Sequence, residues 1–421
     1  MSRPPSLPPD PAMRGHIKKR GTWQYTLELG LRPLQRCPAC RKRYWVEKER
    51  LKRCPRCQGP LEDAEERRQE FHTGYASKKE AENDLAQAIV ALSTGAYVLN
   101  SKLPFSEYLR DEWLPSVRPT IRSTTYLSYE GHVERHIIPS LGSTTLQQLS
   151  ASQLNAFYAR LLSGSAAGST RPLAPGTVRR VHATLHRALR DAVRWNRISR
   201  SPADGADPPR LGGAPEMKVW KATELKAFLT FEKDSPFYPL WLLLATTGAR
   251  RGEALGLAWE DVDLDAGRIA IRRTLVVIGY DTEVSEPKTK KGRRLLTLDP
   301  ATAAVLRQHR EHQEAQHVAA GGALLETDYV FADADGHPYH PEFISKRFRR
   351  ASKRAGLPPI RLHDLRHTYA TVALAAGIHP KVVSERLGHA NIGITLDTYS
   401  HVLPGLSEEA AARVAALVVP D

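Results

Sequence analysis

The sequence has no long hydrophobic run, no internal repeat and only 4 cysteines among 421 residues. A membrane-spanning helix needs ~20 consecutive, mostly apolar residues, and no stretch approaches that length. The first residues, Met1 to Pro11, are rich in proline and lack the apolar segment of a signal peptide. We therefore expect a cytoplasmic protein that does not associate with a membrane.

What is present is an ordinary globular composition with an excess of positive charge. Hydrophobic residues make up 41% and charged residues 25%, which excludes wholesale disorder and fibrous structure. The formal net charge is +15, and nearly all of it lies in the first half: residues 1–215 carry 34 basic and 20 acidic side chains, against 27 and 26 in residues 216–421. An excess of this size favours a polyanionic partner, with nucleic acid as the first choice.

Breaks in composition predict a multidomain, mainly α protein with α+β parts. Alternating apolar residues at 23–29 and an extended segment at 67–73 predict strands, and Ser77 with Glu80 predicts the capped start of a helix over 77–92. The predicted parts are a flexible leader (1–13), a small sheet-and-helix domain (14–98) with an insertion (35–60), a helical domain (103–205), a linker (206–215), a mixed but mostly helical domain (216–405) and a C-terminal helix (406–421).

All four cysteines lie in the insertion, as the pairs Cys37-x2-Cys40 and Cys54-x2-Cys57. Two such knuckles supply the four thiolates of a tetrahedral zinc site. Disulfides are disfavoured in the cytoplasm, and a redox dithiol would not need two copies. Because all four ligand positions are filled, we predict structural rather than catalytic zinc. Nine basic residues between positions 36 and 56 leave two interpretations open, a solvated face or a DNA contact.

The segment 176–198 predicts a helix with one apolar and one basic face. Val181, Leu185 and Leu189 lie on the apolar face. Six arginines fall within an arc of roughly 100° on the other side: Arg179, Arg180, Arg187, Arg190, Arg194 and Arg197. Asp191 is the only acid in this segment, so the arginines repel one another unless a polyanion lies opposite them. We interpret the stripe as a contact with a DNA backbone, with a merely solubilising face as the alternative.

Two motifs of the second half carry clustered cations. In Thr247 to Glu253 (TGARRGE), a glycine turn before a helix leaves backbone N–H groups free and places Arg250 near the positive helix end. Glu253 lies on the same helical face and could orient an arginine. The stretch 287–294 (PKTKKGRR) separates two strand-like segments, 268–278 and 295–298, and predicts a β-hairpin with lysines at its tip. Taken alone, each motif has a blander interpretation, a surface Arg–Glu pair and a charged turn.

Two further motifs follow near the C-terminus. In His363-Asp364-Leu365-Arg366-His367-Thr368, His363 and Arg366 are three residues apart and therefore point from one face of a helix. Leu387-Gly388-His389 ends a short helix that Pro380 opens, and Tyr399 follows ten residues later.

Together, these motifs resemble the active site of the phage-integrase class of tyrosine recombinases. Thr-Gly-x-Arg-x-x-Glu, a hairpin lysine, His-x-x-Arg, Leu-Gly-His and a tyrosine occur here in that family's order. The resemblance is strong over 220–403. It is moderate over 103–205, as the SAM-like, core-type DNA-binding domain, and loose over 20–98, as the arm-type DNA-binding domain. The zinc insertion departs from the family's usual arm domain.

The resemblance implies a role for each motif residue. Tyr399 would attack a DNA phosphodiester and form a 3′-phosphotyrosyl link, which preserves the bond energy and requires no ATP, metal or other cofactor. Arg250 and Arg366 would bind the non-bridging oxygens and stabilise the charge at phosphorus. His363 would take or relay the tyrosine proton, and His389 would donate a hydrogen bond to the phosphate.

Other residues near the motifs are assigned by position. Lys288 is the expected general acid for the leaving 5′ oxygen, and Lys290 and Lys291 remain alternatives. Three neighbours are expected to pack, to support the site or to lie at the surface: His367, Tyr369 and His401.

The resemblance also implies partners. An arm-type domain favours an integrase of a phage or integrative plasmid, with four protomers acting on two attachment-site duplexes through a Holliday junction, and it leaves room for an accessory DNA-bending or excision factor. The helix at 406–421 would dock on a neighbouring protomer or on its own domain. Two rivals are a type IB topoisomerase and a zinc-containing DNA-binding regulator with vestigial catalytic residues. The full motif set argues against the regulator, because binding alone needs no nucleophile beside two arginines.

Overall fold

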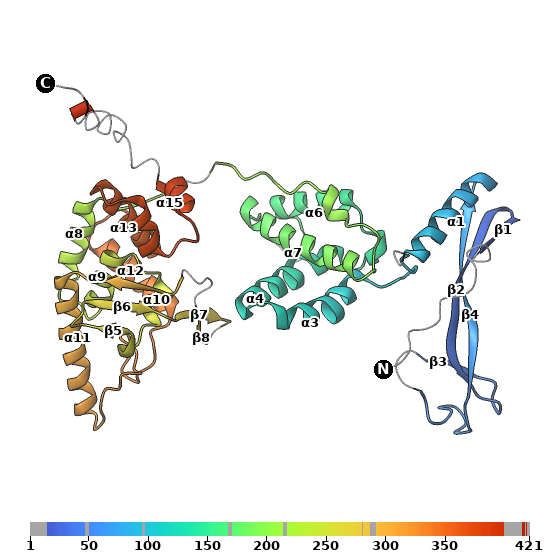
Figure 1. The fold of residues 1–421 in the computed structure, drawn as a ribbon, viewed down its shortest axis with the longest axis horizontal. Helices are drawn as coiled ribbons and strands as arrows, with labels where there is room; N and C mark the ends of the chain where they lie inside the picture. Colours follow the sequence, from blue (N-terminus) through green and yellow to red (C-terminus); the bar gives the residue numbers. More distant parts are fainter. Residues whose placement is uncertain are drawn as a thin grey trace. The chain divides into compact units, whose positions relative to one another are not determined.

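The computed structural model describes residues 15–399, apart from 47–49, 95–96, 167–170, 214–216, 280 and 287–291, and also residues 415, 416 and 418. One compact unit comprises residues 1–122 and 128–211, and the other comprises 123–127 and 212–421. Helices predominate and the sheets are small, which confirms the predicted fold class (Figure 1). Within the described residues, no helix combines the length and apolar composition that a membrane span requires. The predicted leader lies outside the described residues, as does most of the predicted C-terminal helix.

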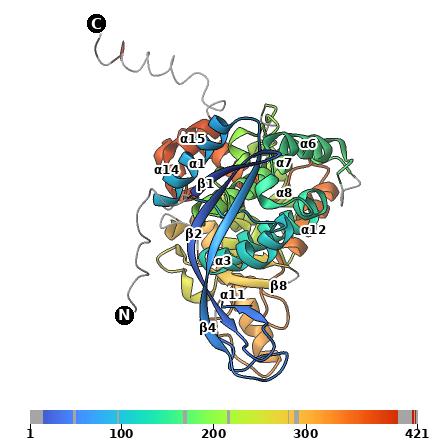
Figure 2. The same cartoon turned by 90° about the vertical axis from the view of Figure 1, so that its right-hand side faces the viewer.

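The first unit begins with an antiparallel sheet and one helix. Its elements are β1 (Gly15–Arg20), β2 (Thr22–Arg36), β3 (Arg43–Trp45), β4 (Glu62–Tyr75) and α1 (Lys78–Ser93). β2 is the central strand and pairs with the other three. Figure 2 shows β2 and β4 as a long twisted ribbon, longer than the strands predicted at 23–29 and 67–73. Helix α1 covers one part of this ribbon, where Leu85 packs against Tyr25 and Leu27.

Helix α1 begins where the capping signal predicts it. The Ser77 hydroxyl accepts a hydrogen bond from the Glu80 N–H at 3.2 Å, and the Glu80 carboxylate accepts one from the Ala76 N–H at 3.0 Å. The two side chains satisfy backbone donors that the helix itself leaves unpaired.

The rest of the first unit is helical, and two of the helices, one of which begins with residues 123–127 of the second unit, contain a wide π-helical turn. The first runs through α2 (Phe105–Glu107), η2 (Tyr108–Trp113) and α3 (Leu114–Val117), the second through α4 (Ser123–His132), η4 (Val133–Ile137) and α5 (Ile138–Leu141). Each π turn is followed by a proline, Pro115 or Pro139. Because proline has no N–H, it cannot close the α-helical hydrogen bond at that point, and the turn widens. The remaining elements are η3 (Arg118–Thr120), η5 (Leu146–Gln148), α6 (Ala151–Ser163), α7 (Pro175–Arg194) and η6 (Pro202–Gly205).

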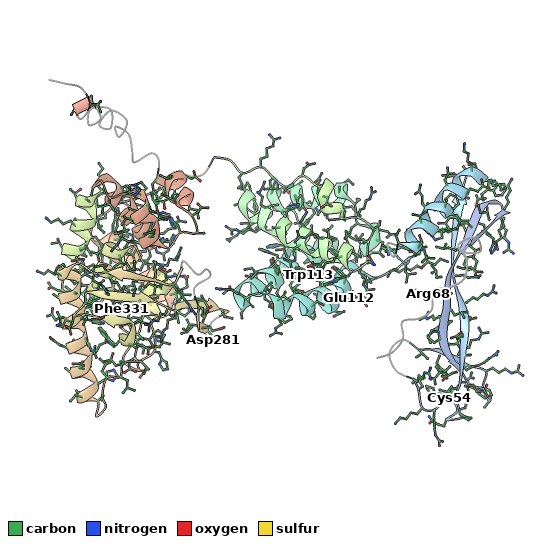
Figure 3. All side chains as sticks on the ribbon, viewed as in Figure 1. Cys54, Arg68, Glu112, Trp113, Asp281 and Phe331 are labelled. Carbon is green, nitrogen blue, oxygen red and sulfur yellow. The ribbon has the colours of Figure 1, made fainter. Side chains whose placement is uncertain are left out.

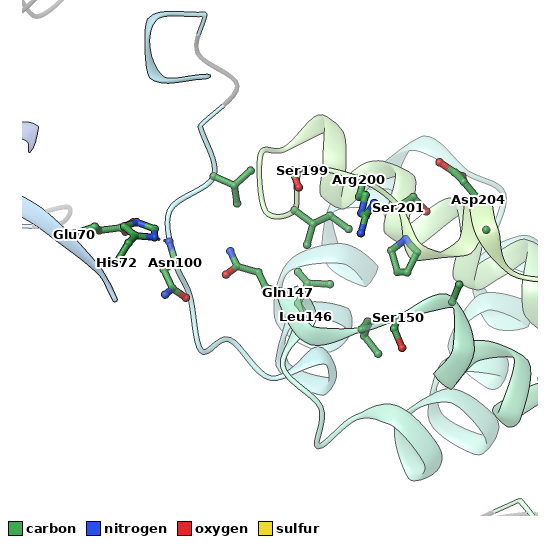
Figure 4. Close-up of a pocket in the computed structure, with 16 residues that line it drawn as sticks. Glu70, His72, Asn100, Leu146, Gln147, Ser150, Ser199, Arg200, Ser201 and Asp204 are labelled. Carbon is green, nitrogen blue, oxygen red and sulfur yellow. Dashed lines mark hydrogen bonds and ion pairs between the residues drawn. The ribbon is translucent and has the colours of Figure 1, made fainter. Parts of the chain in front are cut away.

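Residues 97–103 connect the sheet to the helices of this unit. The Asn100 N–H donates to the Glu70 carboxylate at 3.1 Å on the sheet side. On the helical side, the Gln147 amide donates to the Leu99 carbonyl at 2.7 Å and to the Arg197 carbonyl at 3.1 Å. Figure 4 shows Asn100 next to Glu70 and Gln147 on the opposite side of the connecting chain.

The second unit consists of helices around small sheets. Its helices are α8 (Ala222–Phe231), α9 (Tyr238–Thr247), α10 (Arg251–Leu255), η7 (Trp259–Asp261), α11 (Pro300–Ala319), α12 (Pro341–Arg354), α13 (Asp364–Ala375), α14 (Pro380–Leu387) and α15 (Ile392–Tyr399). Four buried aromatic rings form the centre of the core: Trp220, Phe228, Trp241 and Phe348. Helix α13 packs beside α9 and α14, which brings the His363 and Thr247 motifs together.

The strands of the second unit are arranged differently from the predicted single hairpin. One sheet contains β5 (Val262–Asp263), β6 (Arg268–Ile271) and β9 (Arg294–Thr297), and a separate hairpin contains β7 (Thr274–Ile278) and β8 (Asp281–Ser285). β6 and β9 pair as the predicted hairpin requires, but β7 and β8 are inserted between them. The lysines therefore lie in the connection from β8 to β9. Lys288, Lys290 and Lys291 fall in the stretch 287–291, outside the described residues.

Candidate active site

Two helix ends hold the two arginines of the predicted site. α9 ends at Gly248 and α14 at Gly388, both in the left-handed conformation, with φ of 66° and 65°. The Arg366 guanidinium donates to the Gly248 carbonyl at 2.9 Å and to the Leu387 carbonyl at 2.6 Å. The Arg250 guanidinium donates to the Gly388 carbonyl at 3.4 Å. The carbonyl groups at the negative ends of two helices thus fix the two cations.

Gly248 is also a point of close approach. A Cβ atom at this position would lie 2.5 Å from the Tyr369 ring and 2.8 Å from the Leu387 side chain. Its positive φ further disfavours any other residue. Glycine therefore allows α9, α13 and α14 to meet where the arginines lie.

The carboxylate of Glu253 links Arg250 to a further arginine, Arg294. This carboxylate accepts hydrogen bonds from the Arg250 N–H at 2.8 Å and the Arg250 guanidinium at 2.7 Å, and it also accepts two from Arg294, at 3.1 and 2.9 Å. Burial tends to raise the pKa of Glu253, but the pairing with Arg294 and Arg250 outweighs it and lowers the pKa to about 2. The sequence predicted that backbone N–H groups at this turn are free. The N–H of Arg250 is not, because it donates a hydrogen bond to Glu253.

Arg366 is a buried cation beside a second cation. Its exposed fraction is 4%, and its pKa falls to about 9 because of burial first and the nearby Arg250 next. It remains charged at neutral pH. Two guanidiniums held together with one buried carboxylate leave an excess of positive charge, so the site is suited to an anion.

Two histidines, His363 and His389, lie in the electrostatic environment of the two arginines. Burial is the main cause that lowers the pKa of His363 to about 4 and that of His389 to about 4, so both imidazoles are neutral at pH 7. For His389 the next contributions come from Arg366 and Arg250, which places all three groups in one electrostatic environment. A hydrogen bond of 2.8 Å joins His389 Nδ1 to the Thr395 hydroxyl. This bond orients the ring and leaves Nε2 for a ligand.

Tyr399 lies at the end of α15 with an exposed fraction of 1%. Burial raises its pKa to about 12, although Arg366 opposes the shift. A hydrogen bond of 2.7 Å joins its hydroxyl to His367 Nδ1. The structure thus brings together six residues predicted for the site, Arg250, Glu253, His363, Arg366, His389 and Tyr399, whereas Lys288 and His401 lie outside the described residues.

The sequence profile of the phage integrase family matches residues 220–405, the segment that carries all these groups. A second profile, the phage integrase N-terminal SAM-like domain, matches residues 105–162. The chain belongs to the phage integrase family. It is therefore a site-specific tyrosine recombinase, an enzyme that breaks and rejoins DNA strands.

Relatives and solved structures agree with this family. A XerC-like tyrosine recombinase of Caldanaerobacter subterraneus subsp. tengcongensis is 28% identical over 358 residues, 80% of this chain and 88% of the relative. The ICEBs1 integrase of Bacillus subtilis is 24% identical and covers 72% of this chain and 80% of its own length. The fold resembles that of the Tn1549 transposon integrase in complex with circular intermediate DNA (TM-score 0.62, 20% identity, 74% of this chain, 100% of that chain). It also resembles the lambda integrase dimer bound to a core site (TM-score 0.52, 17% identity, 95% of this chain, 96% of that chain).

One residue with specific contacts in this integrase site escaped the sequence interpretation. Arg294 is nearly buried, pairs with Glu253 and donates to the Arg386 carbonyl at 2.6 Å, so it connects the Arg250 motif to α14. No local signal separates it from Arg293 or the lysines before it. His367 was expected to support the site or to lie at the surface, and the structure places it in contact with the Tyr399 hydroxyl. Its position one helical turn after His363 was the available signal.

Tyr369, the other described neighbour named from the sequence, packs against Gly248 and accepts a hydrogen bond from Arg386 at 2.6 Å.

The six arginines of the predicted stripe have different environments. Asp191 is buried, accepts a hydrogen bond from the Trp113 indole at 3.1 Å and pairs with both Arg187 at 3.0 Å and Arg194 at 3.1 Å. Arg197 lies beyond the end of α7 and pairs with Glu112 at 2.9 Å. Figure 3 shows Glu112 and Trp113 side by side in this helical part.

The other three arginines have fewer partners. Arg179 donates to the Pro209 carbonyl at 3.3 Å. Arg180 and Arg190 are exposed and form no ion pair with another described residue. These two are the stripe residues most available to a ligand.

The four cysteines converge at the end of the β2–β4 ribbon opposite α1, where Figure 3 labels Cys54. All four sulfurs lie within 4.8 Å of one another, and the Cys37–Cys57 and Cys40–Cys54 sulfurs are 3.4 and 3.5 Å apart. Two equivalent turns hold them. The Cys37 N–H donates to the carbonyl five residues on, that of Lys42, and the Cys54 N–H donates to that of Gly59.

Most basic residues around this cluster are not neutralised by neighbours. Arg43 pairs with Glu66 at 2.7 Å and Arg50 with Asp63 at 2.6 Å, both acids being on β4. Six others form no ion pair within the described part of the chain: Arg36, Arg41, Lys42, Lys52, Arg53 and Arg56.

Proposed function

We propose that this enzyme integrates and excises a phage or an integrative plasmid by cutting DNA attachment sites through a 3′-phosphotyrosyl intermediate on Tyr399. The observation that carries the proposal is the convergence of two fixed guanidiniums and two neutral imidazoles with the hydroxyl of Tyr399 in one half of the chain. A phosphodiester is the anion that such a set of donors fits, and the phenol supplies a nucleophile.

In the cleavage step, the Tyr399 oxygen forms a bond to phosphorus and the bond from phosphorus to the 5′ oxygen breaks. Arg250 and Arg366 would bind the non-bridging oxygens, and His389 would donate its Nε2–H to one of them. The leaving 5′ oxygen would take a proton from Lys288, or from Lys290 or Lys291 if the motif alignment is shifted. The chemistry of tyrosine recombinases needs no cofactor, because the phosphotyrosyl bond stores the energy for rejoining.

The earlier parts of the chain would position the DNA. We assign residues 103–205 to core-type DNA binding, 14–98 to arm-type DNA binding and 216–405 to catalysis, with 206–215 as the linker. Solved relatives support the assignment, since the Tn1549 integrase is in complex with circular intermediate DNA and the lambda integrase with a core site. A homotetramer on two duplexes, resolving a Holliday junction and aided by an accessory bending or excision factor, is the corresponding assembly. The segment 406–421 would contribute by docking on a neighbouring protomer.

We assign the arm-type domain a structural zinc ion held by Cys37, Cys40, Cys54 and Cys57. Tetrahedral zinc with Zn–S bonds of about 2.3 Å puts its sulfurs about 3.8 Å apart. The cysteine sulfurs already lie within 4.8 Å of one another, which supports the assignment. Arg41 and Gln58, which follow the second cysteine of each pair, both have positive φ, 60° and 57°, so the two turns have the same geometry. The ion would tie the ends of β2 and β4 together.

Within the helical domain, we assign DNA backbone contacts to Arg180 and Arg190 before the other stripe residues. Their side chains are exposed and without an ion-pair partner in the described structure, whereas Arg187 and Arg194 are bound to Asp191. A phosphate can therefore approach Arg180 and Arg190 without breaking an existing pair.

The proposal is tested by trapping covalent adducts on sheared genomic DNA from the organism that carries the gene. Sequencing the trapped ends identifies the cleaved site. The wild-type protein and a Tyr238→Phe control should form adducts at one sequence, and Tyr399→Phe should form none while still binding that DNA. Adducts that persist in Tyr399→Phe would reassign the nucleophile. A wild-type protein that forms none would refute the proposal.

A further inference from the structure

The hydroxyl of Tyr399 has a defined hydrogen-bond partner. That partner is His367 Nδ1, at 2.7 Å, with the two ring centroids 5.9 Å apart. Within the described part of the chain, the hydroxyl has no hydrogen bond to His363. The His363 ring lies instead against the His367 ring, edge to face, with centroids 5.3 Å apart.

The hydrogen bond has the geometry that a proton transfer requires. In the imidazole tautomer with the proton on Nε2, Nδ1 accepts the phenolic proton directly. A general base must lie about 2.6–3.2 Å from the group that it deprotonates, and His367 meets this criterion before DNA is bound.

We propose that His367 is the catalytic base that takes the proton of Tyr399 during DNA cleavage. The inference rests on the proposed function and adds a reacting group to it. As the Tyr399 oxygen bonds to phosphorus, its proton passes to His367 Nδ1 and gives an imidazolium. The proton lost by Lys288 goes to the 5′ oxygen at the other end of the reacting phosphate. In the rejoining step His367 returns its proton to the phenol as the phosphotyrosyl bond breaks.

The surroundings of His367 keep its imidazole neutral before cleavage, and Asp364 is the neighbour that favours the imidazolium formed afterwards. Burial is the main cause that lowers the pKa of His367, Asp364 opposes the shift, and Arg366 and Arg361 add to it, so the ring is neutral at pH 7 and its Nδ1 lone pair is available. Burial raises the pKa of Tyr399 to about 12, so only about one molecule in 10⁵ carries a phenolate at pH 7. An adjacent base removes the need for that rare form. The titratable or charged groups facing the imidazole are His363, Asp364, Arg366, Arg361, His389 and Tyr399.

A purely structural role would give the same hydrogen bond, so the test separates bonding from proton transfer. His367→Asn places an amide oxygen near the position of Nδ1, which can accept the phenol's hydrogen bond but cannot take its proton. The assay measures the rate of adduct formation on a nicked duplex of the trapped site, from which the cleaved strand dissociates. His312→Asn, on the exposed face of α11, is the matched control.

We expect His367→Asn to bind the duplex as the wild type does, to keep its melting temperature, and to form adducts about 10²–10⁴ times more slowly at pH 7. The defect should shrink as the pH rises toward that of phenol ionisation, because hydroxide then replaces the base. Exogenous imidazole should partly restore His367→Gly. A His367→Asn rate equal to that of the wild type, or a defect that is constant with pH, would show a positioning role and overturn the proposal.

A second substrate distinguishes the base from the acid. When sulfur replaces the 5′ bridging oxygen, the leaving thiolate needs no proton, because its pKa is near 8.5. The defect of His367→Asn should persist on this duplex, and that of Lys288→Ala should be relieved. Relief of the His367→Asn defect would place His367 on the leaving group instead. Since the wild type forms adducts in either case, these outcomes leave the proposed function intact. Only adducts of Tyr399→Phe, or none with the wild type, would refute it.

Discussion

Replacing Glu253 with glutamine tests whether the arginine pair depends on one buried carboxylate. The pKa of Glu253 is lowered from 4.5 to about 2, which corresponds to about 3 kcal/mol of stability at neutral pH. Glu253→Gln keeps the shape of the side chain but leaves Arg250 and Arg294 facing each other without a counter-charge. The variant should therefore lose about 3 kcal/mol in its free energy of unfolding at pH 7.

The pH dependence of that loss checks its cause. Because the folded-state pKa is depressed, the carboxylate stabilises the fold fully above its unfolded pKa of 4.5 and loses this effect as the pH falls toward 2. At about pH 3.5, one pH unit below the unfolded pKa, the wild type should already have lost about 1 kcal/mol of this contribution, whereas the variant, which has no carboxylate at this position, should have lost none of it.

Urea unfolding of both proteins at about pH 7 and about pH 3.5 measures the difference. Glu260→Gln is the matched control, because Glu260 also pairs with an arginine, Arg273, but at the surface. The control should change stability little at either pH. A Glu253→Gln loss that is the same at both pH values, or no larger than that of the control, would refute the assignment of Glu253 as the charge that holds the arginines.

Two further predictions concern the DNA-binding half of the chain. Cys54→Ser should release one zinc ion per chain, measured by atomic emission, and should lower the melting temperature of the first unit; unchanged metal content would remove the zinc assignment. Arg180→Gln with Arg190→Gln should reduce the slope of log affinity against log salt by about 2, since each phosphate contact contributes about 0.9. Arg187→Gln, in contrast, should destabilise the helical part, because it breaks a pair with Asp191; if it reduced the salt slope as much without loss of stability, the division of the stripe would be wrong.

Local signals in the sequence predicted local structure well. Ser77 and Glu80 predicted the start of α1, because helix caps involve residues three positions apart. The spacing of the apolar residues predicted which face of α7 is buried, including Val181 and Leu185. The family motifs predicted the enzyme class, and those within the described residues lie at turns or helix ends with their own sequence signatures, such as Gly248.

Contacts between distant segments were not predictable in the same way. Asp191 was identified as the one acid of its helix, but its burial under Trp113, 78 residues earlier, is a tertiary feature that periodicity does not contain. Arg294 on β9 and Glu253 on α10 are 41 residues apart, so their pairing depends on the tertiary fold and not on a local pattern. The inserted hairpin between β6 and β9 was missed because a continuous β-rich stretch gives no sign of where pairing changes partner.

In the proposed reaction, Tyr399 is the residue that becomes covalently linked to DNA. Digestion of the trapped adduct with nuclease and protease, followed by mass spectrometry of the nucleotide-bearing peptide, identifies the linked residue directly. We expect a 3′-phosphonucleotide on the tyrosine of the peptide ITLDTYS, residues 394–400. A nucleotide found on Tyr369 or on any other of the 14 tyrosines would contradict it.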